Sequence, residues 1–374
     1  MPKLLFLISE DWFFVSHFLP MARAAREAGF EVVVAARMRA HRERIEAAGC
    51  RVIPFEIERG SVAPLAVLRG LKRAYNIVRT EKPDIVHCIA LRMIILGGIP
   101  AKLAGARSLV LAPTGLGHLW ISEGLNDRLM RFVTRALVVP MLRGPRTHFL
   151  FENGEDPPEL GLDAAGADVT IVPGAGVDPA VFPQMPAPAA PPLRVAVVAR
   201  MIRPKGIAEA VEAVRLAQDM GAPVELDLYG GRDPENPLSI AEADLRRWSQ
   251  QRGVAWHGVT NDVPAVWRDH HVALFLSSYR EGVPRTVTEA AACGRPIVTT
   301  DAVGCRELVR HEIEGLLVPP GDATAAARAL HRLAGDAALR ARLGAAAHRR
   351  FLERFTEHAV RSGVSELYRK AISA

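Results

Sequence analysis

The alternation of short apolar runs with amphipathic stretches limits most strongly what this chain can fold into. In the first half, KLLFLIS is followed by the helical pattern HFLPMARAAREAG and then by FEVVVAA, with further apolar runs at DIVHCIA and SLVLAPT. Strand, helix and strand at this spacing predict a parallel sheet with helices on both faces. The chain is therefore predicted to be an α/β protein.

A proline-rich segment, FPQMPAPAAPPL at residues 182–193, interrupts this pattern. Such segments are extended and do not join a core, so we predict a linker there. A second cycle of strand candidates follows, at RVAVVAR, VELDLYG, GVAWHG, VALFLSS, RPIVTT and GLLVPP. A chain of 374 residues exceeds the usual size of one domain. We predict one domain at 1–181 and another at 194–355, with a helix at 356–374 that packs back on the first.

The composition, 49% hydrophobic and 24% charged, is that of a soluble globular protein. No apolar run approaches the roughly 18 to 20 residues of a spanning helix, and the start MPKLLFLISEDW lacks a signal-peptide cleavage pattern. The four cysteines form no C-x-x-C pair, which argues against a zinc site or a disulfide scaffold. We therefore expect a cytoplasmic protein.

The charge is unevenly distributed along the chain. Residues 1–150 hold 22 Lys and Arg against 12 Asp and Glu, whereas residues 151–374 hold 25 against 29. A basic first half indicates an anionic partner. Nucleic acid is not expected, because aromatic residues make up only 6% of the chain and offer few stacking platforms. An anionic membrane surface or a lipid phosphate fits better.

Two glutamates, Glu281 and Glu289, stand at the ends of EGVPRTVTE. Gly282 removes side-chain bulk, and Pro284 is well suited to open a helix that carries Glu289. Such a corner presents backbone N–H groups and the positive end of a helix to a diphosphate, and leaves two carboxylates for hydroxyl groups. A nucleotide-sugar offers both partners. Taken alone, the pair also fits a helix start with two solvated acids.

Two cations follow the strand candidate LRVAVVA. Arg200 comes first, and Lys205 with Gly206 opens the helical stretch IAEAVEAVRLAQ. Cations beside a helix start suit a diphosphate whose negative charge grows as it leaves, although solvated cations at a turn would look the same. Ligands of such sheets bind at the carboxyl ends of strands, and a cleft between two domains is the expected site.

Three second-half segments, VARMIRPKG, WHGVTNDVPAVWRDHHVALFLSSYREGVPRTVTEAAACGRPIVTTDAVGCRELV and EGLLVPPGD, resemble the second domain of retaining GT-B glycosyltransferases of family 4. In the first half, EDWFFVSHFLPMARAAREAGFEVVVAAR, KPDIVHCIALRMIILGGIPAKLAGARSLVLAPTGLGHLW and TIVPGAGVDPAVF resemble the branch that elongates polyprenyl-diphosphate-linked oligosaccharides for bacterial surface polysaccharides. The resemblance implies two Rossmann-like domains that face each other across a cleft.

The resemblance also implies roles for single residues. Arg200 and Lys205 would bind the donor diphosphate, Glu281 would contact hydroxyls of the donor sugar, and Glu289 would hold the ribose. Glycine positions after strands would let the backbone approach the nucleotide, and a His-Gly pair would lie near the base. These further donor-side positions are Gly206, Gly230, Gly231, His257, Gly258, Gly282, Val283, Pro284 and Arg285.

The mechanism implied by the resemblance keeps the anomeric configuration and needs no covalent enzyme intermediate. The cations and the helix after Pro284 would stabilise the departing diphosphate, so no metal or other cofactor is expected besides the donor. No D-x-D motif is present. We interpret the adjacent His270 and His271 as a surface pair, because neighbouring residues on a strand point to opposite faces.

The acceptor side departs from the family pattern, in which a histidine followed by glycine ends a first-domain strand. Here LAPTGLGHLW places Thr114 before Gly115, and His118 follows three residues later. His118 is a candidate for contacting the donor sugar or the acceptor, or is a structural loop residue. Asp11 and His17 follow the first strand; Asp11 would orient the acceptor or cap a helix. DWFF replaces the family's glycine-rich first loop, which indicates a differently shaped acceptor entrance.

Residues 126–146, NDRLMRFVTRALVVPMLRGPR, combine apolar and basic residues at helical spacing. This pattern fits a helix that lies on an anionic membrane, and equally a core-facing helix with solvated arginines. A lipid-linked acceptor would favour the membrane. The location expected on this basis is the inner face of the cell membrane.

The function expected from these features is transfer of a hexose or N-acetylhexosamine from a UDP-sugar to a polyprenyl-diphosphate-linked saccharide. A nucleotide-sugar 2-epimerase of the same fold is an alternative, and so is a noncatalytic nucleotide-binding subunit of a glycan-assembly complex. A classical dehydrogenase is disfavoured, because TGLGHLW and PGAGVD do not complete G-x-G-x-x-G after a strand.

Overall fold

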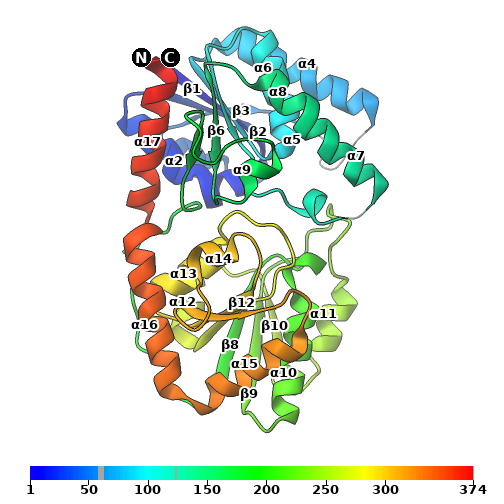
Figure 1. The fold of residues 1–374 in the computed structure, drawn as a ribbon, viewed down its shortest axis with the longest axis vertical. Helices are drawn as coiled ribbons and strands as arrows, with labels where there is room; N and C mark the ends of the chain where they lie inside the picture. The colour runs from blue at the N-terminus through cyan, green and yellow to red at the C-terminus, as the bar shows by residue number, and fades with distance from the viewer. Residues whose placement is uncertain (58–62, 123, 374) are drawn as a thin grey trace. The chain divides into compact units, whose positions relative to one another are not determined.

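The computed structural model describes residues 1–57, 63–122 and 124–373. Contacts divide the chain into two compact units (Figure 1). Unit 1 consists of Met1–Gly176 and Glu357–Ala374, and unit 2 consists of Val177–Thr356. Each unit is an α/β structure around its own parallel sheet, as the sequence predicts.

The sheet of unit 1 has the strand order β3-β2-β1-β4-β5-β6-β7. Its strands are β1 Lys3–Glu10, β2 Glu31–Arg37, β3 Arg51–Pro54, β4 Ile85–Ile89, β5 Ser108–Ala112, β6 Thr147–Phe151 and β7 Val169–Ile171. Its helices are α1 Asp11–Phe13, α2 Leu19–Glu27, α3 Arg42–Ala47, α4 Pro64–Glu81, α5 Leu91–Met93, α6 Ile99–Leu103, α7 Leu125–Val133, α8 Val139–Leu142, α9 Asp156–Glu159 and α17 Glu357–Ser373. Of these strands, β3, β6 and β7 lie outside the apolar runs from which strands are predicted.

Three helices of unit 1 contain a π-helical stretch with a proline just behind it. These stretches are Phe14–Phe18, Ile94–Gly98 and Thr134–Val138, and they join α1 to α2, α5 to α6 and α7 to α8. Each is followed by one residue and then by Pro20, Pro100 or Pro140. A proline cannot donate to the carbonyl four residues before it and clashes with it. The wider π turn accommodates the proline without ending the helix.

The two faces of the unit 1 sheet carry separate hydrophobic clusters. Along β1, Leu4, Phe6 and Ile8 join one cluster, whereas Leu5 and Leu7 join the other. This alternation follows from the period of two along a strand. Because helices cover both faces, the strand reads as a continuous apolar run in the sequence.

The last helix, α17, packs against α2 in unit 1 (Figure 1). Its Tyr368 is fully buried, and the Tyr368 hydroxyl lies 2.9 Å from Nδ1 of His87 on β4. Burial lowers the pKa of His87 to about 3, so this imidazole is neutral and shares one hydrogen bond with the hydroxyl. A buried hydrogen bond therefore connects the end of the chain to a central strand.

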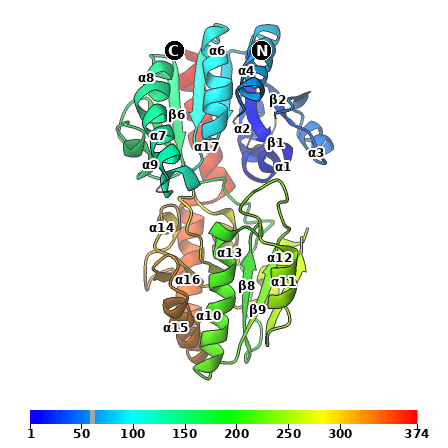
Figure 2. The same ribbon diagram turned by 90° about the vertical axis from the view of Figure 1, so that its right-hand side faces the viewer.

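The sheet of unit 2 has the strand order β10-β9-β8-β11-β12-β13. Its strands are β8 Leu193–Val198, β9 Val224–Tyr229, β10 Val254–Gly258, β11 Val272–Phe275, β12 Ile297–Thr300 and β13 Gly315–Val318, and all coincide with predicted runs. Its helices are α10 Ile207–Asp219, α11 Glu242–Trp248, α12 Val263–Asp269, α13 Arg285–Ala292, α14 Cys305–Leu308, α15 Ala323–Gly335 and α16 Ala337–Arg354. Helices α10 and α15 lie side by side on one face (Figure 2).

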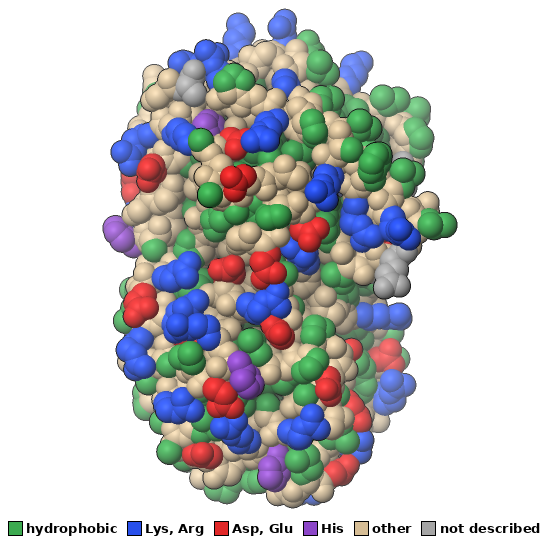
Figure 3. All heavy atoms as spheres, viewed as in Figure 1, with side chains coloured by type: hydrophobic (Ala, Val, Ile, Leu, Met, Phe, Trp, Pro, Cys, Tyr) green, Lys and Arg blue, Asp and Glu red, His purple; other side chains and the backbone are tan. Residues whose placement is uncertain are grey.

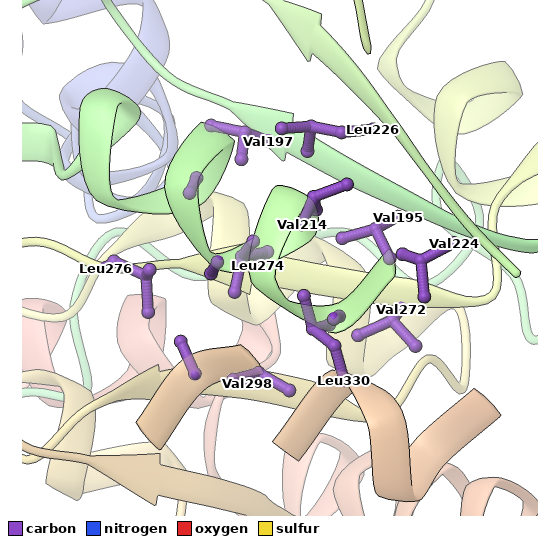
Figure 4. Close-up of a cluster of buried hydrophobic side chains, with 14 of the residues drawn as sticks. Val195, Val197, Val214, Val224, Leu226, Val272, Leu274, Leu276, Val298 and Leu330 are labelled. Atoms are coloured by element: carbon purple, nitrogen blue, oxygen red, sulfur yellow. The ribbon is translucent and has the colours of Figure 1, made fainter. Parts of the chain in front are cut away.

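The core between these two helices and the sheet is made of branched aliphatic side chains. Val195 and Val197 of β8, Leu226 of β9 and Leu274 of β11 meet Val214 of α10 there (Figure 4). All five are almost completely excluded from solvent. This packing fixes the carboxyl ends of β8, β9 and β11, from which the candidate site is built.

The proline-rich segment 182–193 lies within unit 2, and the boundary between the units falls between Gly176 and Val177. Phe182 is buried in a core cluster of unit 2. The carbonyl oxygen of Pro186 accepts a hydrogen bond from the buried Arg295, and that of Pro188 lies 3.1 Å from Nε2 of His271. Hydrogen bonds from buried side chains therefore attach this segment to unit 2, although its composition alone indicates a linker.

Replacing Tyr368 by Phe should destabilise unit 1 by about 1–3 kcal/mol, because Nδ1 of His87 would remain buried without its hydrogen-bond partner. Thermal unfolding measured by circular dichroism checks this. Tyr75→Phe is the control, since Tyr75 is an exposed tyrosine of α4 in the same unit. Equal loss in both variants would contradict a role for the buried hydrogen bond.

Candidate active site

The cations and carboxylates predicted for the donor side follow neighbouring strands of unit 2. Arg200 and Lys205 come after β8, and Glu281 comes after β11, which pairs directly with β8. Glu289 lies on α13, which starts after the Glu281 loop. The carboxyl ends of parallel strands share one edge, where open α/β sheets bind ligands.

Lys205 and Glu281 form a direct ion pair. The distance from Nζ of Lys205 to Oε1 of Glu281 is 2.7 Å, and their side chains are only 14% and 17% exposed. The Lys205 ammonium also stands 5.1 Å from the centre of the Phe275 ring. The structure thus brings together two residues that are 76 positions apart in the sequence.

Ser277 is a further member of this group that the sequence analysis missed. Its hydroxyl donates to Oε1 of Glu281 at 2.7 Å, and the residue is fully buried. The hydroxyl of Thr300 on β12 donates to the Ser277 carbonyl at 2.6 Å. The place of Ser277 in the sequence could have indicated this role, since Ser277 directly follows the apolar run VALFL, where β11 ends.

These contacts keep Glu281 ionised. Burial by itself would raise the pKa of this carboxyl, but the nearby Lys205 ammonium, its hydrogen bond and that of Ser277 outweigh burial, and Arg200 adds to them. The net pKa of Glu281 lies below its ordinary value. Glu281 is therefore a fixed carboxylate that can accept hydrogen bonds from hydroxyl groups.

Arg200 pairs with a second residue that the sequence analysis did not select. Its Nη1 lies 2.9 Å from Oδ2 of Asp233, which follows Gly230 and Gly231 after β9. The Arg200 side chain is 37% exposed, so its guanidinium remains accessible to a ligand. Backbone bonds join the two loops, since the Met201 N–H donates to the Gly231 carbonyl at 2.9 Å.

Glu289 has a different environment from that of Glu281. It is buried on α13, where Oε1 accepts from Nε of Arg285, one turn earlier, at 2.7 Å. Burial raises the pKa of Glu289 above its ordinary value, and Arg285 opposes that shift only in part. Pro284 is the N-cap residue of α13, and Gly282 and Val283 precede it.

Several of the predicted glycines are required by close protein contacts. A Cβ on Gly206 would stand 2.1 Å from the Leu276 carbonyl oxygen, and one on Gly230 would stand 1.7 Å from that of Ala199. Both residues also have a positive φ, which glycine adopts without strain. Gly258 has a φ of +72° with nothing within 4 Å of an added Cβ, so open space adjoins that position.

His257, Asp227 and His270 form a connected group beside β9. The Asp227 carboxylate lies 2.5 Å from Nε2 of His257 and 2.9 Å from Nε2 of His270. The His257 ring stacks on Tyr229 with centroids 4.7 Å apart. His257 is thus held at the start of the turn that contains Gly258.

The interpretation of His270 and His271 as a surface pair is wrong. Each residue is only 2% exposed. Both precede β11, so alternation along a strand does not apply to them. Nδ1 of His270 lies 2.7 Å from the Val266 carbonyl oxygen, and Nδ1 of His271 accepts from the Arg194 N–H at 3.0 Å. Within residues 1–57, 63–122 and 124–373, no group of three or more His, Cys, Asp or Glu is arranged to hold a metal ion.

In unit 1, Asp11 holds a loop. Its fully buried carboxylate accepts backbone N–H bonds from Arg39, Ala40 and His41 through Oδ2, and from Trp12 through Oδ1. Burial would raise the pKa of Asp11, but these hydrogen bonds lower it on balance. The carboxylate thus links the carboxyl ends of β1 and β2, which is a structural role.

The other acceptor-side candidates also follow strands of unit 1. His17 lies in the π-helical stretch after β1, with Nδ1 2.6 Å from the Ser16 hydroxyl. Thr114 and Gly115 follow β5 with φ of 59° and 90°, a conformation that is strained for threonine. The His118 side chain lies outside the described part of the structure.

The segment predicted to lie on a membrane forms an exposed helix in unit 1. Leu129 and Phe132 of α7 are 59% and 64% exposed, and Leu137 is exposed as well. None of the α7 residues is buried. Val138, Val139 and Leu142, later in the same segment, are buried in a core cluster of unit 1, so the alternative of a core-facing helix holds for that part. Hydrophobic side chains gather over this part of the surface at the upper right of Figure 3. No helix in the described ranges is long and apolar enough to cross a membrane.

The fold, with one parallel α/β sheet in each of two units, is that of GT-B glycosyltransferase structures. Residues 192–336 match the family model described as Glycosyl transferases group 1, and residues 3–143 match that described as Glycosyl transferase 4-like. The chain belongs to this glycosyltransferase family, as the resemblance in its motifs indicates.

Curated relatives and solved structures agree with this assignment. A Campylobacter jejuni protein named N,N'-diacetylbacillosaminyl-diphospho-undecaprenol alpha-1,3-N-acetylgalactosaminyltransferase is 26% identical over 96% of both chains. The putative glycosyltransferase EpsD of Bacillus subtilis is 24% identical over 98% of this chain and 96% of its own. The Anabaena HepE structure in complex with UDP-glucose is 20% identical, with a TM-score of 0.75 over 99% of this chain and all of HepE.

Replacing Lys205 by Met should make the free energy of unfolding decrease as the pH rises from about 5 to 8. In the native protein the pKa of Glu281 is lowered, so its stabilising effect is complete above the ordinary value of 4.5. Without Lys205, burial would raise this pKa, and ionisation on raising the pH would leave a buried unpaired charge. The free energy of unfolding is expected to decrease by at most about 3–5 kcal/mol, the range found when one partner of a buried ion pair is removed.

Urea unfolding at several pH values measures this effect. The control is the double variant Lys205→Met, Glu281→Gln, which carries no ionisable carboxyl at position 281 and should show no such slope. A single variant whose stability is independent of pH would show that the ion pair does not hold Glu281 ionised.

Proposed function

We propose that this glycosyltransferase is retaining and moves a hexose or N-acetylhexosamine from a UDP-sugar to a polyprenyl-diphosphate-linked saccharide in bacterial polysaccharide synthesis. The observation that carries the proposal is the partly buried Lys205–Glu281 pair with Arg200 beside it. Cations suit the donor diphosphate, and the fixed carboxylate suits the hydroxyls of the sugar.

The chemistry required of these residues is electrostatic. As the sugar–phosphate bond breaks, negative charge grows on the diphosphate and positive charge on the sugar ring. Arg200, Lys205 and the amino end of α13 are groups that stabilise the departing diphosphate. The acceptor hydroxyl enters on the face that the phosphate leaves, so the anomeric configuration is retained. No metal is needed for these steps.

The names of related proteins support the two substrates. The Campylobacter relative is named for a diphospho-undecaprenol acceptor, and HepE was solved in complex with UDP-glucose. Other relatives include a capsular polysaccharide glycosyltransferase of Staphylococcus aureus, 27% identical over 46% of this chain. A basic unit 1 is consistent with an acceptor that carries phosphate.

The test is to incubate the purified protein with a panel of UDP-sugars, with and without a synthetic lipid-diphosphate-linked sugar, and to measure product masses. We expect one donor to add one sugar to the acceptor, and NMR of the product to show the donor's anomeric configuration. A changed UDP-sugar in the reaction without acceptor would identify an epimerase instead. Nucleotide binding without any turnover would identify a noncatalytic subunit.

The same assay separates the roles of the two glutamates. Glu281→Gln should lower kcat more than donor affinity, by about 100-fold or more if its interactions strengthen in the transition state. Glu289→Gln should instead weaken UDP binding with a smaller effect on kcat, because its proposed contact is with the ribose. Calorimetric titration with UDP gives the affinities. Equal effects of both substitutions on both quantities would contradict this division.

We further propose that the enzyme is peripheral at the inner face of the cell membrane and docks there through α7 and the π-helical stretch that follows it. The exposed side chains of Leu129, Phe132 and Leu137 lie in one segment with Arg128 and Arg135. Apolar side chains that enter a bilayer next to cations for anionic headgroups are the usual composition of interfacial helices. A lipid-linked acceptor would then be within reach at the same surface.

The double substitution Leu129→Ser, Phe132→Ser should reduce binding to vesicles that contain phosphatidylglycerol by about tenfold or more, since each buried apolar side chain contributes about 1.5–3 kcal/mol. Co-sedimentation with such vesicles measures the effect. The control is Ile313→Ser, Leu352→Ser, which removes two exposed apolar side chains from unit 2. An equal loss in the control, or equal binding to neutral vesicles, would contradict docking through α7.

A further inference from the structure

A second basic pocket lies in unit 1, at the carboxyl edge of its sheet. It has a volume of about 260 Å³, and its lining includes Arg37, Arg69 and Arg73. Arg37 ends β2, and the two other arginines are one turn apart on α4. The rest of the lining combines Glu56 and Ile57, after β3, with Ala66 and Gly70 of α4. None of the donor-side residues belongs to this pocket.

The three arginines of the pocket differ in their burial and in their partners. Arg37 is buried and forms an ion pair with the buried Glu10, with Nη2 2.8 Å from Oε1. Arg73 donates from Nη1 to the Glu56 carbonyl oxygen, which fixes its position beside the pocket. Arg69 and Arg73 are both exposed to solvent. Glu10 compensates one of the three positive charges and Glu56 in the lining a second, which leaves a surplus of one positive charge that favours an anion.

Small side chains form part of the lining of this pocket. Gly70 and Ala66 are the α4 residues that line it with Arg69 and Arg73. The lining between α4 and the ends of β2 and β3 thus combines three guanidinium groups with Glu56, Ile57 and two small residues.

The pocket is slightly smaller than the roughly 300–1,000 Å³ of pockets that enclose a whole small ligand. A nucleotide-sugar exceeds it, whereas one phosphate or diphosphate group suits it. Guanidinium groups bind phosphate oxygens through paired hydrogen bonds, and several of them together suit a doubly charged group. The carboxyl edge of an open α/β sheet is also where such folds bind ligands.

We propose that this pocket binds the diphosphate of the lipid-linked acceptor, through Arg69 and Arg73 with Arg37 behind them. This inference rests on the proposed function and adds the group by which the acceptor is recognised. The enzyme then has two separate diphosphate sites: the Arg200 and Lys205 group for the donor in unit 2, and the α4 pocket for the acceptor in unit 1.

The test compares two acceptors that carry the same saccharide, one on a short polyprenyl diphosphate and one on a neutral alkyl chain. Wild-type enzyme should use the diphosphate acceptor with the lower KM. The double variant Arg69→Ala, Arg73→Ala should raise that KM by about tenfold or more, because hydrogen bonds to charged groups are lost. The kcat, the affinity for UDP and the rate with the neutral acceptor should stay within about twofold.

Lys72→Ala, Arg79→Ala is the matched control, because it removes two exposed cations from α4 that do not line the pocket. It should leave the KM for the diphosphate acceptor unchanged. At saturating UDP-sugar, which occupies the donor site, inorganic diphosphate should compete with the diphosphate acceptor in the wild type and lose that effect in the pocket variant. If free diphosphate alone binds and the KM does not change, the pocket holds a free anion and the inference is wrong.

An equal rise in KM in both double variants would attribute the effect to the general charge of α4 and would also overturn the inference. Wild-type enzyme that uses neither acceptor would instead contradict the proposed function. The two failures are therefore distinguishable in one set of assays.

Discussion

Both sheets contain only parallel pairs between their strands, and the candidate sites depend on this constraint. A parallel pair needs a crossover, so the carboxyl ends of all strands lie at one edge. In unit 2 that edge collects Lys205 after β8 and Glu281 after β11. In unit 1 it collects Arg37 after β2, next to the first half of α4. Cations far apart in the sequence are thereby brought to the two edges at which we propose the diphosphate sites.

Burial then gives similar side chains different properties. Glu281 and Glu289 are eight positions apart, yet the pKa of Glu281 is lowered and that of Glu289 is raised. The difference arises from their partners, because Lys205 and Ser277 surround Glu281, whereas Glu289 has only Arg285 to oppose burial. A permanently charged carboxylate suits contact with a sugar that becomes positive. The sequence motif contains both acids without distinguishing them.

Unit 1 shows how local chemistry adapts the same fold to another substrate. The DWFF segment leads from β1 into a helix in which Pro20 is accommodated by a π-helical stretch, and the buried Asp11 carboxylate binds the loop after β2. A further π-helical stretch before Pro140 continues α7 into α8, and Leu129 and Phe132 of α7 are exposed. An apolar, basic surface and a basic pocket thus lie in the unit that is expected to meet a lipid diphosphate.

The sequence by itself determined the α/β class, the six strands of unit 2 and the positions of Arg200, Lys205, Glu281 and Glu289 after strands, because apolar periodicity and strand ends are local features. Only the tertiary structure decided which groups meet. Ser277 and Asp233 became members of the site, His270 and His271 became buried, and 182–193 joined unit 2. These outcomes depend on partners distant in the chain, such as Asp227 for His270 and Arg295 for Pro186. A local sequence pattern does not predict these contacts, because they form only when distant parts of the chain pack together.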